Sequence, residues 1–244
     1  MIEIRHQTDL RTKYDSIYQG QYINQMESFF IWIQEILRVT RGSLFLDIST
    51  GRGRMVKVAA RRGVRAYGID FSMNACRIAS QVSPGRIICS DAQYLPFADA
   101  SFDFVTNLGS LEHLDDMSKG VREIVRVLKD DGWVCITVPN TFGLFWNVQV
   151  AWRTGDVDDD GQPIQRYGTR KQWEKLLQEN GLEIVRVYGY EHEHAPPRTW
   201  FDLKRYCFRP FRIMRMLLSG VLPVNMAGQF VFICKKKIPW DRGN

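Results

Sequence analysis

LFLDISTGRGR, at residues 44–54, is the stretch that decides the fold of this chain. Its first half is an apolar run that closes with an acid, which is typical of a buried parallel strand. Gly51 and Gly53 then leave bare backbone against which a flat ligand can lie. Residues 55–62 are good helix formers, so we expect the turn to end at a helix N-terminus with unpaired N–H groups. This pattern predicts a nucleotide-type site.

A second apolar run with a terminal acid supports the same site. It spans residues 64–70 and ends at Asp70, about 20 residues after the turn, where nucleotide-binding folds place their ribose-binding carboxylate. The third glycine of a dinucleotide-binding turn is missing, Arg54 lies in that region, and nothing resembles a Walker lysine. We therefore expect a ligand that has a ribose but no phosphates.

A series of motifs in order resembles the class I S-adenosylmethionine-dependent methyltransferases, particularly the small-molecule group called type 11. The matching segments are 46–54, 67–72, 89–97, 101–105, 110–114, 125–133 and 138–140. The resemblance covers roughly residues 44–140, and the rest more loosely. It implies an α/β, Rossmann-like three-layer sandwich with a seven-stranded, mostly parallel sheet whose last strand is antiparallel. It also implies S-adenosylmethionine as cofactor and S-adenosylhomocysteine as product.

The resemblance assigns roles to the acids and to Arg54. Asp70 would accept both ribose hydroxyls, the alternative being an acid that stabilises the start of the next helix. Asp91 would accept from the adenine amino group, although an ordinary turn aspartate fits nearly as well. Asp47 would order the glycine loop by accepting its N–H groups and would face the cofactor's ammonium. Arg54 would pair with the methionine carboxylate or else face solvent.

Other positions complete the expected cofactor site. Phe71 would pack on the adenosine, the Ala92 N–H would reach a ring nitrogen, and the backbone at Asn107 and Leu108 would line the methionine side. Ser49 replaces a glycine that is usual in the family and puts a hydroxyl against the methionine moiety. The full expected set is Asp47, Ser49, Thr50, Gly51, Gly53, Arg54, Asp70, Phe71, Asp91, Ala92, Asn107 and Leu108.

The reaction implied is an in-line displacement at the methyl carbon, for which orientation alone supplies much of the catalysis. His113, with Glu112 beside it, is the candidate general base, and a structural role in the cofactor pocket is an equal alternative. His192 and His194 have a spacing that could bind a metal, but no third ligand is near in sequence. We expect a reaction without metal.

We expect one methyltransferase domain over residues 1–244, with the cofactor-binding core at 44–140. Residues 1–40 have a helical pattern, and the resemblance implies that they form a lid that brings Tyr14 and Tyr18 to the substrate, although a tyrosine stripe more often packs in a core. The pattern then lapses over 141–168, an acceptor-site insert with a short helix, an acidic loop, and Phe142 and Trp146 as substrate contacts.

The C-terminal part returns to a regular pattern. Thr169 is an expected N-cap for a helix through Asn180, followed by strands at 182–188 and 228–235. Between them, residues 198–224 mix aromatic residues with arginines and lysines. This element is either a cap packed on the domain or an interfacial helix that meets lipid phosphates.

Composition indicates the class of protein and where it is located. The chain of 244 residues is 45% apolar and 25% charged, as globular domains are. Its five cysteines lack paired spacing, and it shows no signal peptide or spanning segment, so we expect a reducing, cytoplasmic location, with peripheral membrane contact if 198–224 is interfacial.

Motifs of the methyltransferases that modify nucleic-acid amino groups, cytosine C5, protein arginine or catechols are missing from the sequence. We predict methyl transfer to a small organic, partly apolar or lipid-like acceptor. The net charge of +6 motivates an RNA methyltransferase as one alternative, although we regard nucleic acid as the less expected partner. A non-catalytic cofactor-binding or membrane-peripheral protein is the other. The oligomeric state is not predicted.

Overall fold

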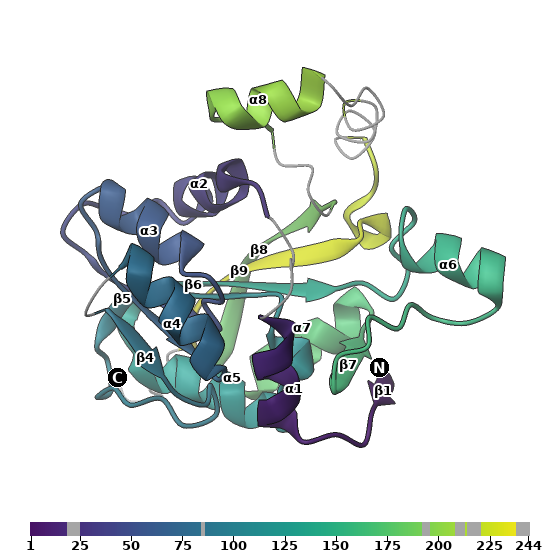
Figure 1. Cartoon of the computed structure of the whole chain (residues 1–244), viewed down its shortest axis with the longest axis horizontal. Coiled ribbons are helices and arrows are strands. Elements are labelled where there is room, and N and C mark those ends of the chain that lie inside the picture. The colour runs from purple at the N-terminus through teal and green to yellow at the C-terminus, as the bar shows by residue number, and fades with distance from the viewer. Residues whose placement is uncertain (19–24, 84–85, 192–195, 208–212, 214–220, 238–244) are drawn as a thin grey trace, which may run out of the picture.

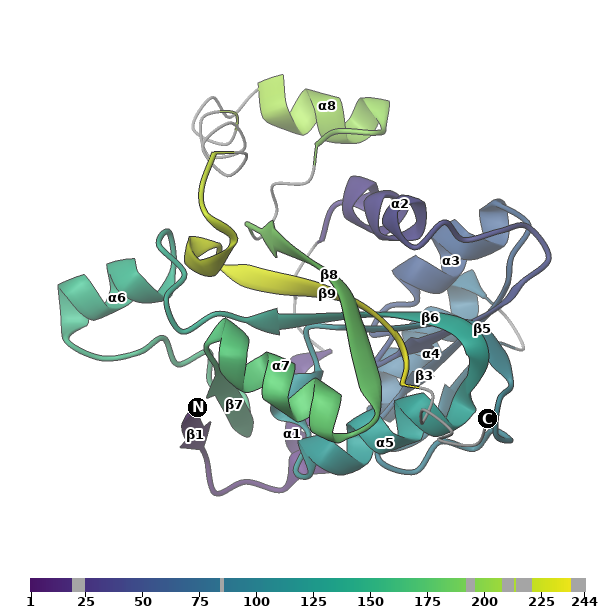
Figure 2. The ribbon, with the colours of Figure 1, turned by 180° about the vertical axis from the view of Figure 1, so that it is seen from behind.

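The computed structural model describes residues 1–18, 25–83, 86–191, 196–207, 213 and 221–237, with the backbone alone for 205–207. Its centre is a seven-stranded sheet with the order β4-β3-β2-β5-β6-β9-β8 (Figures 1 and 2). The strands are β2 (Leu44–Ile48), β3 (Arg65–Asp70), β4 (Ile87–Cys89), β5 (Phe102–Leu108), β6 (Leu128–Pro139), β8 (Leu182–Tyr190) and β9 (Gln229–Lys236). Strands β2 to β6 are parallel and β9 is antiparallel to both neighbours. The predicted fold class is confirmed.

Helices cover both faces of the sheet and bury two separate apolar clusters. The helices of the core are α2 (Glu27–Ile36), α3 (Arg54–Arg61), α4 (Met73–Val82), α5 (Met117–Val127) and α7 (Arg170–Glu179). Helices α2 and α3 pack with Phe45 and Phe104 on one face, whereas α5 and α7 pack with Leu46 and Val105 on the other. Adjacent residues of β2 and β5 thus point to opposite faces, as the strand period of two requires.

The turn between β2 and α3 follows from backbone conformations that few residues adopt. Ser49, Gly51 and Gly53 all have positive φ angles, of 57°, 53° and 70°. Gly53 is the N-cap of α3, and a Cβ there would meet the Cβ of Ala79 in α4 at 3.0 Å. Glycine is therefore needed both for the angle and for the close approach of the two helices. The predicted strand, turn and helix are confirmed.

The N-terminal region differs from the predicted helix over residues 1–40. It forms β1 (Ile2–Arg5), α1 (Leu10–Ile17) and the separate helix α2. Strand β1 pairs antiparallel with β7 (Ile164–Tyr167) of the insert to make a second, two-stranded sheet. The alternating sequence Ile-Glu-Ile-Arg has the period of a strand, but its partner lies about 160 residues away, so helical periodicity in the following residues concealed it.

The insert and the C-terminal part contain α6 (Asn147–Thr154), α8 (Trp200–Cys207) and the short 3-10 helix η2 (Val224–Met226). The predicted short helix in the insert is α6, but β7 was not foreseen. Thr169 caps α7 as predicted, in a capping box with Gln172. Strands β8 and β9 lie where predicted, β8 being two residues longer. Within the described residues, no helix is long and apolar enough to cross a membrane.

Helix α8 is joined to the body at one buried point. The Asp202 carboxylate accepts hydrogen bonds from the N–H of Ser28 at 2.8 Å and from its hydroxyl at 2.6 Å. The N–H of Arg198 donates to the same hydroxyl, and its guanidinium pairs with Glu35 at 2.8 Å. These polar contacts hold the start of α8 against α2.

Trp173 gives a direct test of the core. It is fully buried in α7, and its indole N–H donates to the carbonyl of Pro139 at the end of β6. We expect Trp173→Ala to lower the free energy of unfolding by about 3–5 kcal/mol, because it leaves a large cavity and an unpaired carbonyl. Trp152→Ala is the matched control. Its side chain is exposed in α6, so we expect a change within about 0.5 kcal/mol in denaturant unfolding.

Candidate active site

The carboxyl ends of β2, β3, β5 and β6 meet at one edge of the sheet, and two buried carboxylates lie there. Asp47 accepts hydrogen bonds from the hydroxyls of Thr50 and Thr106, each at 2.7 Å. Burial raises its pKa to about 6, against the lowering effect of these hydrogen bonds. Asp47 thus orders the loop through the Thr50 hydroxyl, whereas no N–H group of the loop donates to it among the described residues.

Asp70, the second carboxylate, connects two turns. Its Oδ2 accepts the N–H of Gly51 at 2.8 Å and its Oδ1 accepts the N–H of Ser72 at 2.9 Å. Burial raises its pKa to about 6, while these backbone hydrogen bonds lower it. Each carboxylate oxygen has a second lone pair, so Asp70 keeps acceptor capacity while it holds the glycine turn and the start of α4 together.

Helix α1 lies over these turns, so the structure brings Tyr14 and Tyr18 to the predicted cofactor residues. A Cβ on Gly51 would meet the Tyr18 phenol oxygen at 3.2 Å. The Tyr14 and Phe71 rings meet edge to face with centroids 6.3 Å apart. Asp15 of α1 accepts from the Ser72 hydroxyl at 2.5 Å. Helix α1 therefore covers the glycine turn with aromatic rings and is joined to the start of α4.

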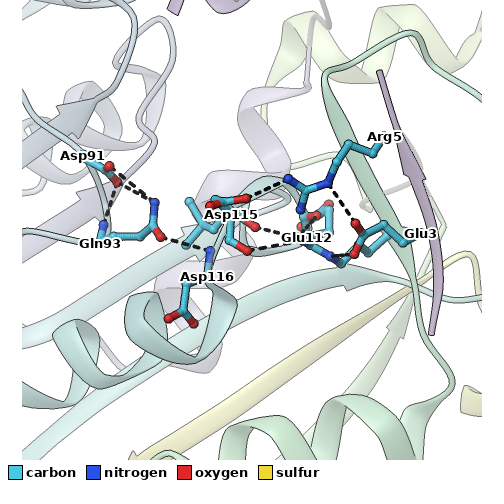
Figure 3. Close-up of polar contacts among 9 residues, drawn as sticks. Glu3, Arg5, Asp91, Gln93, Glu112, Asp115 and Asp116 are labelled. Atoms are coloured by element: carbon cyan, nitrogen blue, oxygen red, sulfur yellow. Dashed lines mark hydrogen bonds and ion pairs between the residues drawn. The ribbon is translucent and has the colours of Figure 1, made fainter. Parts of the chain in front are cut away.

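Asp91 and Ala92 follow β4 as expected, at the same edge of the sheet. Ala92 is buried, and the Asp91 carboxylate accepts the backbone N–H of Gln93 at 2.8 Å. The Gln93 amide oxygen accepts the N–H of Asp116 at 3.0 Å, as Figure 3 shows. Gln93 thereby joins the loop after β4 to the residues that follow β5.

Asn107 and Leu108 lie at the end of β5. Asn107 is fully buried, and among the described residues neither atom of its side-chain amide has a hydrogen-bond partner. A buried amide without partners costs free energy unless a ligand or water satisfies it. Asn107 therefore marks a polar binding position inside the sheet edge. Its side chain, and not only its backbone, is therefore a candidate for ligand contact.

Glu112 and His113 form the short 3-10 helix η1 (Leu111–His113) just beyond β5. The His113 Nδ1 lies 2.6 Å from the carbonyl of Ile164, so we assign the proton to Nδ1 and the lone pair to Nε2. Nε2 lies 3.9 Å from Oε1 of Glu112. Burial lowers the pKa of His113, which keeps the imidazole neutral. The predicted base thus has the protonation state that a base requires.

Glu112, which the sequence indicated only as the neighbour of the candidate base, has an unusual environment. It is buried, its Oε2 has no partner among the described residues, and burial raises its pKa to about 8. The pKa of the Tyr14 phenol is raised by burial and also by the charges of Glu112 and Asp70. Tyr14 therefore lies near both carboxylates and links the cofactor side of the site to η1.

Strand β7 contacts η1 through Arg166, a long-range contact that no local sequence motif could predict. The buried guanidinium of Arg166 donates to the carbonyls of Glu112 at 3.2 Å and Leu114 at 2.5 Å, and it pairs with Glu3 at 2.7 Å. Arg5 of β1 adds an ion pair with Asp115 at 2.8 Å. Figure 3 shows Glu3, Arg5, Asp115 and Glu112 in this arrangement. The insert thus positions η1.

Two predicted substrate residues are exposed, and Arg54, next to the glycine turn, is engaged with another backbone group. Phe142 and Trp146 are exposed on the insert, and the Trp146 indole N–H donates to Asp158 at 2.9 Å. The Arg54 guanidinium donates to the carbonyl of Gln25 at 2.6 Å. Phe142 and Trp146 are therefore not brought to His113, because α6 projects from the body (Figure 1). His192 and His194 lie outside the described residues.

Comparisons with known proteins agree with this geometry. Residues 46–136 match the family model described as a methyltransferase domain. An uncharacterized protein of Methanocaldococcus jannaschii is 28% identical over 77% of this chain and 78% of its own length. A demethylmenaquinone methyltransferase of Thermobifida fusca is 34% identical, over 39% of this chain and 43% of its own length. The chain spans less than half of that second relative.

The core of this chain is an S-adenosylmethionine-dependent methyltransferase domain. A solved structure, the [4+2]-cyclase SpnF, superposes on 94% of each chain with a TM-score of 0.65 and 20% identity, which shows a shared fold. S-Adenosylmethionine is the cofactor of such domains. Sequence reasoning did not place Ser110, Gln165 and Tyr167 among the candidate site residues, because their proximity to His113 depends on β7 packing beside η1.

Glu112 gives the methyltransferase a testable pH dependence. A carboxyl whose pKa is raised by folding binds more protons in the folded chain between its two pKa values, so its ionisation destabilises the fold as pH rises through that window. We expect Glu112→Gln to become progressively more stable relative to the wild type from about pH 5 to about pH 8, since the amide does not ionise.

Denaturant unfolding of both proteins across this pH range measures the effect. Glu183→Gln, at an exposed glutamate of β8, is the matched control. A difference between Glu112→Gln and the wild type that stays constant with pH would contradict the raised pKa of Glu112.

Proposed function

We propose that this protein transfers the methyl group of S-adenosylmethionine to a small organic acceptor with an apolar part. One observation carries the proposal. The same sheet edge holds a bare-backbone turn between Asp70 and Tyr18 and, beside it, buried polar atoms of Asn107 and Glu112 that have no partner among the described residues. The bare backbone of the turn suits a nucleoside. The buried polar atoms suit polar groups of the methionine moiety and of the acceptor.

The residues present fit the cofactor. Asp70 would accept from the ribose hydroxyls with the lone pairs that Gly51 and Ser72 leave free. Phe71 would pack on the adenosine, and Asp91 with the Ala92 N–H would contact the adenine. The Asn107 amide, with one donor and one acceptor group, suits the carboxylate and ammonium of the methionine moiety.

The remaining predicted positions would surround the methionine side of the cofactor. Thr50 holds Asp47 in place, and the positive φ angle of Ser49 shapes the turn. Arg54 would pair with the carboxylate if it exchanged its hydrogen bond with Gln25 for that contact. Helix α1 would act as the lid, with Tyr14 and Tyr18 excluding water from the reacting atoms.

The chemistry needs orientation more than it needs activation. The sulfonium supplies a methyl group with a neutral thioether as leaving group, so holding the acceptor in line accounts for much of the catalysis. We assign His113 as the general base for an acceptor that must lose a proton. Its Nδ1 is held by Ile164, which leaves Nε2 to accept that proton in a buried position.

The acceptor class rests on the surroundings of this site. Tyr14 and Tyr167 contribute apolar rings, while Glu112 and Gln165 offer a few buried polar atoms. Such a combination of groups suits a molecule with an aromatic, isoprenoid or acyl part and at least one hydrogen-bonding group. The name of the demethylmenaquinone methyltransferase, whose sequence the core resembles, supports an acceptor of this kind.

Asp70→Ala tests the cofactor assignment. We expect it to weaken binding of S-adenosylmethionine by about 1.5–3 kcal/mol, because charged hydrogen bonds are lost. Isothermal titration calorimetry measures the change. Asp130→Ala is the control, since Asp130 is exposed at the opposite edge of the sheet, where it pairs with Lys236. Equal affinities of the two variants would contradict the ribose assignment.

Methyl transfer itself is tested with methyl-tritiated S-adenosylmethionine and a metabolite extract from the source organism. We expect protein-dependent label in the organic phase, and a loss of about 10²–10⁴-fold in His113→Ala if proton removal is required. Label confined to the aqueous phase would contradict the apolar acceptor and would favour a polar metabolite or RNA. Cofactor binding without any labelled product would favour a protein that does not catalyse transfer.

A further inference from the structure

Two helices project from the body of the domain without covering its core. Figures 1 and 2 show α6 and α8 standing away from the sheet in both views. Neither packs extensively against another described helix or strand, and α6 buries only Asn147 among its residues. Helices that do not bury an apolar face inside a domain normally carry polar side chains all round. These two do not.

Large apolar side chains are exposed on both helices and on the segment that precedes η2. Trp152 is 86% exposed, Trp200 78% and Phe201 71%. We call the set the apolar rim, and its members are Phe142, Trp146, Trp152, Trp200, Phe201 and Val221. Single exposed apolar residues are common, but a group of exposed aromatic residues on projecting elements marks a surface that meets an apolar partner.

The apolar rim lies on the same side of the molecule as the active site. Strands β6 and β8 end, and β9 begins, at the sheet edge that holds Asp70 and Glu112. The insert and η2 are joined there, since the Leu144 N–H donates to the carbonyl of Met226 at 2.9 Å and the Asn140 amide donates to the carbonyl of Asn225 at 2.9 Å. The elements that carry the rim therefore extend from the same edge of the sheet as the site residues.

The charge of the sequence that includes α8 favours an anionic partner. From residue 198 to residue 215 the sequence has six lysines and arginines, of which Arg198 pairs with Glu35, and the single acid Asp202, whose carboxylate is buried against Ser28. The acidic loop after α6 is engaged within the protein. Asp158 accepts from Trp146, Asp159 pairs with His6, and the charge of Asp160 acts on Glu112 and His113.

We propose that the apolar rim docks the protein on the surface of an anionic phospholipid bilayer, with its aromatic side chains at the level of the headgroups. Tryptophan next to lysine and arginine is the composition that binds this interface, where the ring is half buried and the cation meets phosphate. Each helix has eight residues, so the contact is peripheral. A membrane-bound orientation would present the site to lipid-like acceptors, a benefit that rests on the proposed function.

Vesicle flotation with purified full-length protein tests the proposal without any acceptor. We expect binding to vesicles of phosphatidylcholine with about one third phosphatidylglycerol, and weaker binding to phosphatidylcholine alone or at high salt. The double variant Trp200→Ala/Phe201→Ala should reduce the partition coefficient by about tenfold or more, since two interfacial aromatic residues are lost. Trp152→Ala should reduce it by a smaller factor.

Tyr94→Ala is the matched control, because Tyr94 is an equally exposed aromatic residue in the loop after β4, outside the rim. Circular dichroism and calorimetric binding of S-adenosylmethionine show that each variant is folded. Absence of binding to anionic vesicles would overturn the proposal, as would equal binding of the double variant and the control. A rim-dependent dimer that ignores vesicles, detected by light scattering, would also overturn it and assign the surface to a second copy of the chain.

Vesicle binding and methyl transfer can fail independently. If the wild-type protein does not bind anionic vesicles but still transfers methyl groups to a water-soluble acceptor, only the rim proposal is overturned. Membrane binding without transfer overturns the proposed function alone.

Discussion

The carboxylate of Asp70 accepts the N–H of Gly51 with one oxygen and the N–H of Ser72 with the other. These two hydrogen bonds join the turn after β2 to the turn after β3, so the bare backbone of the first and the helix start of the second face the same space. Asp47 supports the first turn from behind through the hydroxyls of Thr50 and Thr106. The remaining features of the site, including the cover that α1 provides, are arranged around this junction.

The buried polar groups of the site lower the free energy of unfolding, and this cost indicates that they serve a ligand. Three carboxyl groups, those of Asp47, Asp70 and Glu112, are buried with pKa values raised by desolvation. The amide of Asn107 is buried without a partner among the described residues. A chain selected only for stability would replace such groups with apolar ones, because unpaired buried polar atoms are unfavourable. Their retention at one sheet edge is what a polar, cationic ligand would require.

The second sheet, formed by β1 and β7, gives the acceptor side its rigidity. Arg166 extends from this sheet to the carbonyls of Glu112 and Leu114, and the Ile164 carbonyl fixes the His113 ring. His113, Glu112 and strand β1 are therefore linked through β7. Changes in the insert that disturb β7 would shift His113 even though they leave the cofactor residues in place, so acceptor geometry and cofactor geometry are separable in this fold.

The core strands, the glycine turn and the capped helix after Thr169 follow from the sequence, because each depends on residues within one strand, turn or helix. The apolar runs and the glycines are enough to indicate those elements. Only the tertiary structure decided that Ile2–Arg5 is a strand, that Asp47 accepts the hydroxyl of Thr106, and that Glu112 is buried without a partner for its Oε2 among the described residues. Each of these depends on a partner far away in the chain, and the burial that raises the pKa of Glu112 exists only after β7 has packed beside it, which local periodicity cannot encode.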